Sequence, residues 1–69
     1  MDTLVYVLKQ CYDYEGFSII GIFTDEDTAI KEGEKLNASG AYCDRIIVCE
    51  LSLDKIYDYD GCNKVKNIK

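Results

Sequence analysis

The sequence predicts an α+β fold, in which three strands form an antiparallel or mixed sheet and one helix covers one face. Two stretches rich in β-branched and aromatic residues, 4–11 and 17–23, are separated by a short turn sequence, which is typical of a hairpin. A segment with apolar residues at helical spacing follows, and a long alternating stretch over 42–53 comes next. The predicted order is therefore β-β-α-β, with a possible short fourth strand.

The turn of the hairpin is predicted at Tyr12–Gly16, which reads YDYEG. Aspartate suits a turn, and Gly16 can take a positive φ without steric cost. Gly21 lies inside the second strand and indicates a bulge or the close approach of another backbone. A right-handed crossover through the helix would then place the first strand between the second and the third.

The helix is predicted to begin at Thr24, whose hydroxyl can cap the first turn, and acidic residues 25–27 suit the positive end of the helix dipole. Gly33 lies on the apolar stripe of this helix, so we expect the helix to approach the sheet closely there. The helix is expected to end between Asn37 and Gly40, one of which takes the left-handed conformation. The apolar stripe consists of Ala29, Ile30, Gly33 and Leu36.

The strand at 42–53 alternates between two faces. One face carries Cys43, Arg45, Ile47, Cys49, Leu51 and Leu53, and the other carries Tyr42, Asp44, Ile46, Val48, Glu50 and Ser52. Residues 56–59 are interpreted as a short fourth strand or an extended arm. The chain is one domain over 1–69, and residues 62–69 are expected to be a flexible basic tail.

A single helix covers only one face of a sheet, yet the first strand is apolar on both faces. The second face would then pack on another copy of the chain, on a partner protein, or under the C-terminal segment. We expect a homodimer or a partner contact, and the predicted contact face carries Leu4, Tyr6 and Leu8.

Charge and residue types exclude several classes of function. The net charge is −5, which disfavours binding of nucleic acid or of an anionic membrane. The chain has no histidine and no phosphate-binding glycine motif, so we expect no enzyme and no cofactor.

Its four cysteines lack the close pairs of a zinc site, so we expect no metal. They are interpreted as free thiols of a cytoplasmic protein, with two disulfides in a secreted protein as the alternative.

An acidic, tyrosine-rich pentapeptide occurs twice, as residues 12–16 and 57–61. Both copies suit turns, and that is one interpretation. The other is a binding surface, because tyrosine is enriched in interfaces and carboxylates pair with basic residues of a partner. If the sheet ends bring the two copies together, they form a negative pole. The predicted partner-binding residues are Tyr12, Asp13, Tyr14, Glu15, Tyr57, Asp58, Tyr59 and Asp60.

Residues 5–8 read VYVL, residues 12–15 read YDYE, and residues 20–24 read IGIFT before an acidic helix start. This pattern resembles a family of small uncharacterised β-β-α-β proteins of bacteria and their phages. The resemblance implies a phage accessory protein in the host cytoplasm, such as an anti-CRISPR or other anti-defence inhibitor that blocks a basic protein surface. The alternatives are a structural homodimer and a protein that sequesters a small molecule or nucleotide.

Overall fold

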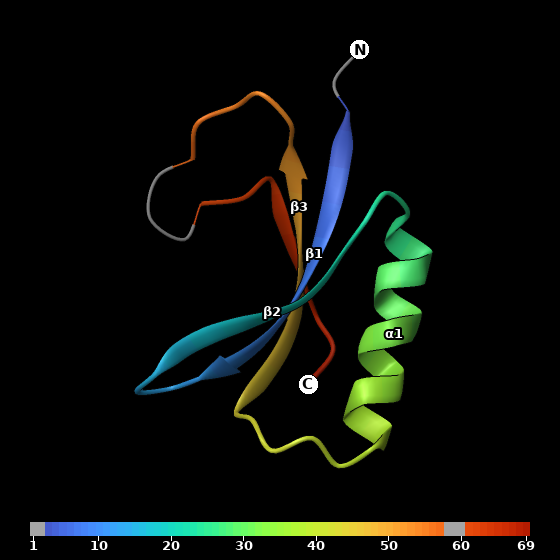
Figure 1. Ribbon diagram of the computed structural model, residues 1–69, viewed down its shortest axis with the longest axis vertical. Helices are drawn as coiled ribbons and strands as arrows, with labels where there is room; N and C mark the ends of the chain where they lie inside the picture. The colour runs from blue at the N-terminus through green and yellow to red at the C-terminus, as the bar shows by residue number, and fades with distance from the viewer. Residues whose placement is uncertain (1–2, 58–60) are drawn as a thin grey trace.

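The protein is described by a computed structural model over residues 3–57 and 61–69. This part of the chain contains four strands and one helix, which are β1 (Leu4–Tyr12), β2 (Gly16–Phe23), α1 (Glu26–Ala38), β3 (Arg45–Ser52) and β4 (Lys64–Asn67). The strands form one sheet in the order β2-β1-β3-β4, and all neighbours are antiparallel. The helix lies along one face of this sheet (Figure 1). The predicted α+β fold, with β1 between β2 and β3, is confirmed.

The fourth strand is not where the sequence pattern indicated. Ile56 and Tyr57 lie outside any strand, and residues 58–59 fall outside the described residues. Instead β4 forms within 62–69, the segment expected to be a flexible tail, and pairs with β3 from Ile47↔Asn67 to Glu50↔Lys64. The pairing of β4 with β3 depends on the position of β3 in the sheet. The composition of residues 62–69 alone therefore did not indicate a strand there. The predicted third strand is also shortened, from 42–53 to 45–52.

The hydrophobic core lies between the sheet and α1. Its buried members are Leu8, Ala29, Ile46 and Val48, and Tyr6 packs against them. The face that carries Leu4, Tyr6 and Leu8 was predicted to be the uncovered face, and this prediction is wrong. Leu8 is only 1% exposed beneath the helix, so the face that the helix leaves uncovered is the opposite one, with Val5 and Val7, although Val7 itself is only 4% exposed. We call it the uncovered face because α1 does not lie on it.

The ends of α1 differ in one respect from the prediction. Asp25, not Thr24, is the N-cap, and its carboxylate accepts hydrogen bonds from the N–H and the hydroxyl of Thr28. At the other end Gly40 has a φ of +80°, as expected. Gly33 is buried, and a Cβ built on it would lie 3.1 Å from side-chain carbons of Leu8 and Ile68. The predicted close approach of helix and sheet is therefore confirmed.

The edge strand β2 contains a bulge. The register with β1 shifts between Leu8↔Gly21 and Lys9↔Ile19, so Ile20 is the extra residue, next to the glycine that indicated a bulge. Strict alternation over 17–23 would place Ile22 on the same face as Ile20, but the bulge places Ile22 on the uncovered face with Phe17 and Ile19. None of the described helices is long and apolar enough to cross a membrane.

Candidate binding surfaces

The turn of the β1–β2 hairpin forms an acidic surface with exposed tyrosines. The N–H of Glu15 donates to the carbonyl of Tyr12, and Gly16 follows with a φ of +84°. Tyr14 is 99% exposed at this turn, and Tyr42 is 94% exposed in the connection between α1 and β3. We call this surface the acidic-tyrosine end, and its residues are Tyr12, Asp13, Tyr14, Glu15, Tyr42 and Asp44.

Asp44 holds the acidic-tyrosine end together. Its carboxylate accepts a hydrogen bond of 2.6 Å from the N–H of Asp13. Its own N–H donates to the carbonyl of Cys11 at 2.9 Å. The connection before β3 is therefore fixed against the hairpin, and it adds a third carboxylate and a further tyrosine. Sequence reasoning missed Tyr42 and Asp44, because they were assigned to a strand.

The second pentapeptide does not join the first. The hydroxyl of Tyr57 accepts a hydrogen bond of 2.7 Å from the N–H of Ser52. Ser52 is at the opposite end of β3 from Arg45, which pairs with Cys11 next to the hairpin turn. The eight-residue strand between these ends spans about 25 Å. The predicted pole of two joined turns is therefore not formed at Tyr57, while Asp58, Tyr59 and Asp60 lie outside the described residues.

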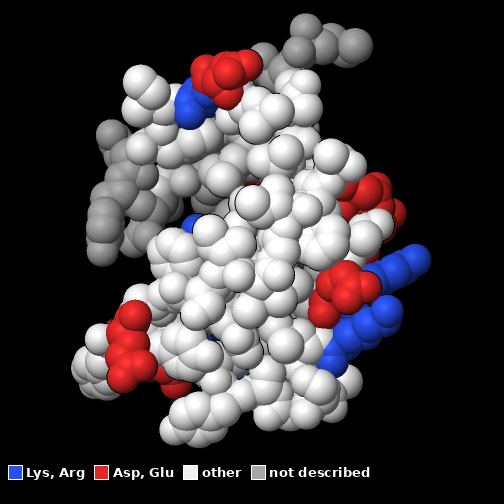
Figure 2. All heavy atoms as spheres, in the orientation of Figure 1, with Lys and Arg blue, Asp and Glu red and all other residues white. Residues whose placement is uncertain are grey.

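A second surface follows β2, which contains no charged residue. Four large apolar side chains of this strand are exposed, with Ile22 at 63%. We call them the β2 strip, and they are Phe17, Ile19, Ile20 and Ile22. Figure 2 shows a broad area without charged side chains across the middle of the molecule, where β2 runs in Figure 1, with acidic side chains at the lower left. Among the described strands, β2 thus carries the largest group of exposed apolar side chains.

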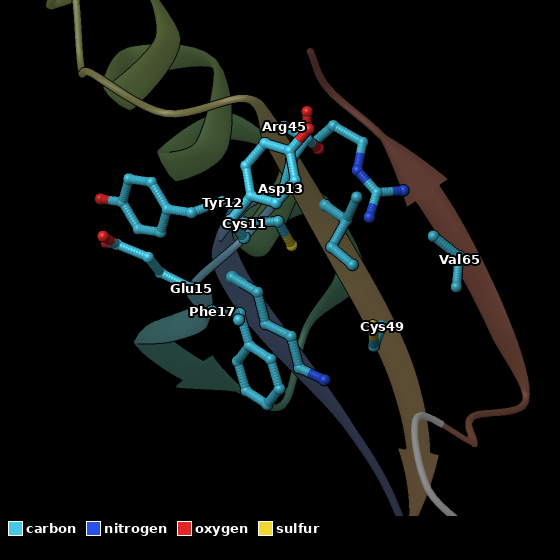
Figure 3. Close-up of a pocket in the computed structure, with 12 residues that line it drawn as sticks. Cys11, Tyr12, Asp13, Glu15, Phe17, Arg45, Cys49 and Val65 are labelled. Carbon is cyan, nitrogen blue, oxygen red and sulfur yellow. The ribbon is translucent and has the colours of Figure 1, made fainter.

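A groove of about 710 Å³ lies on the uncovered face, over β1 and β3, and extends from the hairpin turn to Val65 of β4. Its floor includes Phe17, Ile47 and Val65, and two cationic side chains, Lys9 and Arg45, also line it. Figure 3 shows the guanidinium of Arg45 over the strands and the carboxylate of Glu15 on the outer side of the hairpin. Lys9 lies over the Phe17 ring, with its Nζ 4.2 Å from the ring centroid.

A family model described as a domain of unknown function, DUF7336, matches residues 3–62. The chain belongs to this family. The matched region contains β1, β2, α1 and β3 with the acidic-tyrosine end, and β4 follows it. Neither the curated proteins nor the solved structures contain a significant match to the chain.

The thiols of this DUF7336 domain are free. Burial raises the pKa of the Cys49 thiol, while the nearby charge of Lys9 acts in the opposite direction and the Cys62 thiol raises the pKa further. Cys49 is therefore protonated at neutral pH, which is the opposite of an activated nucleophile. Within the described ranges, no group of three His, Cys, Asp or Glu side chains is arranged to hold a metal ion.

Proposed function

We propose that this protein is a non-enzymatic protein-binding module, which contacts its partner through the β2 strip and the adjoining acidic-tyrosine end. The observation that carries the proposal is the exposure of four large apolar side chains on one uncharged edge strand. Contiguous apolar surface on a small domain is costly in water and marks an interaction site. An edge strand adds main-chain N–H and C=O groups that can pair with an extended partner segment.

The acidic-tyrosine end supplies the specificity of this contact. Tyr14 and Tyr42 are almost fully exposed, and such side chains provide large contact area at low entropy cost. The carboxylates of Asp13, Glu15 and Asp44 would attract basic side chains and guide their approach. The partner we infer therefore has an apolar or extended segment beside a basic surface.

An acidic surface with exposed tyrosines beside an apolar strand suits an inhibitor of a basic protein surface. A small acidic module that covers a basic surface prevents that surface from binding its own anionic ligand. With the resemblance to small phage and bacterial proteins, this supports a phage-encoded inhibitor of host or anti-phage defence proteins, of which anti-CRISPR proteins are one kind. The proposed site of action is the host cytoplasm.

The test is a quantitative pull-down from the native host, with Ile22→Lys and Tyr14→Ala as variants of the two parts of the surface. We expect Ile22→Lys to weaken capture of the specific partner by at least about tenfold, as for loss of a buried interface contact. Tyr14→Ala should also weaken capture, and moderate salt should release the partner from the wild-type protein.

The matched control is Ile56→Lys, which makes the same change at a side chain that is 95% exposed and outside the sheet. It should capture the partner like the wild type. Equal capture by the wild type, Ile22→Lys and Tyr14→Ala would show that neither surface carries the contact.

A structural homodimer is the second candidate, and the contrast between the two sheet edges favours it. The β4 edge carries Lys64 and Lys66, and lysines on an edge strand discourage pairing with other chains. The β2 edge has no charge, and two copies would pair there without repulsion at the seam. Sedimentation velocity at micromolar concentration tests this candidate, since a monomer under those conditions would eliminate it.

A further inference from the structure

We propose that the groove on the uncovered face is a binding site for a singly charged carboxylate that carries an apolar body, such as a medium-chain fatty acid. This site adjoins the contact proposed above but has its own cationic centre. Phe17 of the β2 strip and four residues of the acidic-tyrosine end, Tyr12, Asp13, Tyr14 and Glu15, also line the groove. The proposal rests on the placement of two cations, on the absence of an ion pair to either of them among the described residues, and on the apolar residues beside them.

The register of the sheet places Lys9 and Arg45 close together on one face. Lys9 pairs with Ile47, and Arg45 pairs with Cys11, so the two cations are diagonal neighbours across β1 and β3. Such neighbours have Cα atoms about 7–8 Å apart. Their side chains leave the same face of the sheet, so an oxyanion held over this face would be attracted by both positive charges.

Within 3–57 and 61–69, neither cation has a carboxylate partner. Among the residues that the structure describes, the ion pairs within 4.0 Å involve Lys35 and Lys64, and none involves Lys9 or Arg45. Thirteen acidic residues are present in the chain against eight basic ones, so unpaired neighbouring cations are unexpected from composition. Arg45 offers the planar set of donors that suits a carboxylate, and Lys9 offers a second charge.

The floor of the groove selects the rest of the ligand. Phe17, Ile47 and Val65 supply apolar contact, and the protonated thiol of Cys49 behaves as a small apolar group beside them. The volume of about 710 Å³ lies within the range of small-molecule sites. An apolar chain can therefore lie on the strands while its carboxylate meets Lys9 and Arg45.

The rim of the groove sets the charge of the ligand. Asp13 and Glu15 also line it, and Glu15 points outward on the hairpin. These carboxylates repel polyanions such as nucleic acid, because several negative charges would have to pass the rim. A single carboxylate can reach the two cations with its apolar body directed along the floor, which is why we infer a monoanion.

The experiment is a titration of the uniformly labelled full chain, followed by backbone amide shifts in NMR. The probes are octanoate, 1-octanol as its uncharged counterpart, and acetate as the carboxylate without an apolar body. We expect octanoate to give saturable shifts of the amides of Lys9, Cys11, Ile47 and Cys49 at millimolar concentration. The two comparison probes should bind at least about tenfold more weakly, as expected for loss of one charge-assisted contact or of the buried chain.

Two variants test the role of the cations. Arg45→Gln and Lys9→Gln should each weaken octanoate binding about tenfold, while the exposed helix variant Lys31→Gln should leave it unchanged. Protein capture in the pull-down does not depend on these two variants, so the two proposals can fail separately. The site is refuted if octanoate causes no saturable shifts in the groove, if 1-octanol binds equally well, or if both groove variants bind octanoate like the wild type.

Discussion

Asp25 and Asp44 each accept hydrogen bonds from backbone N–H groups at places where the chain changes direction. Asp25 caps the first turn of α1 through Thr28 at 3.0 Å, and Asp44 binds the N–H of Asp13 at the hairpin turn. In both cases a charged side chain satisfies a main-chain donor that regular secondary structure leaves free. Part of the negative charge of this protein therefore has a structural role.

The Asp25 cap should make the stability of the protein depend on pH. The hydroxyl of Thr28, and then its N–H, hold the pKa of Asp25 below its usual value. A lowered folded-state pKa gives a stabilisation that is complete above the unfolded value and is lost as pH falls through the folded value, here below about pH 4. Asp25→Ala should lower the melting temperature by about 4–8 °C at neutral pH.

The control for this cap is Asp25→Asn, which keeps an acceptor for Thr28 but does not titrate. Thermal unfolding of both variants should be followed from neutral pH to pH 2. The difference between wild type and Asp25→Ala should shrink over the acid range. A difference that is constant with pH would show that the carboxylate charge does not contribute to the cap.

At the level of elements, the C-terminal segment completes the fold. β4 pairs with β3, and after it the N–H of Ile68 donates to the carbonyl of Ile46 at 2.8 Å. The side chain of Ile68 then reaches Gly33 of α1 and packs against the core. Lys64 adds an ion pair of 2.9 Å with Glu26, which raises the pKa of Lys64. This short segment therefore connects the sheet to the helix.

Ile68→Ala is expected to lower the free energy of unfolding by about 1–3 kcal/mol, because it removes a partly buried side chain between α1 and the sheet. Urea unfolding monitored by circular dichroism measures the change. Val65→Ala is the matched control, since Val65 is 48% exposed on the uncovered face, and it should cost clearly less. Equal effects of the two substitutions would mean that Ile68 does not pack in the core in solution.

At the scale of the whole molecule, the two faces of the sheet differ in what they contact. The helix side holds the core, whereas the other side, together with the β2 edge, presents the groove and the β2 strip. The strands at the centre of the sheet, β1 and β3, pair on both sides, and the edge strands β2 and β4 pair on one side. Stability should therefore fall from the centre of the sheet toward its edges.

Hydrogen exchange should show this gradient. The slowest amides are expected in β1 and β3, around Leu8, Ile46 and Val48, which are almost completely buried. The amides of β2 that do not pair with β1 should exchange fastest among the strand residues at low protein concentration. Protection of these amides that increases with protein concentration would show that β2 pairs between two copies of the chain. Protection of β2 equal to that of β1 at every concentration would show that the proposed gradient is wrong.

The residue pattern by itself determined the β-β-α-β order, the two faces of β3, the hairpin turn at Gly16 and the close approach of Gly33. These features depend on residues a few positions apart, through the two-residue period of strands, the helical period and the conformational freedom of glycine. The pattern also indicated the acidic, tyrosine-rich turn as a candidate contact, and the structure places Tyr12, Asp13, Tyr14 and Glu15 together at one end of the sheet.

Only the tertiary structure decided which face of β1 the helix covers, where the fourth strand forms and which residues join the hairpin turn. Both faces of β1 are apolar, so composition cannot distinguish them, and the bulge at Ile20 reverses part of β2. The pairing of β4 with β3, the contact of Asp44 with Asp13 and the neighbouring positions of Lys9 and Arg45 join residues far apart in the chain. Such contacts depend on strand register, which is settled when the whole sheet packs against the helix.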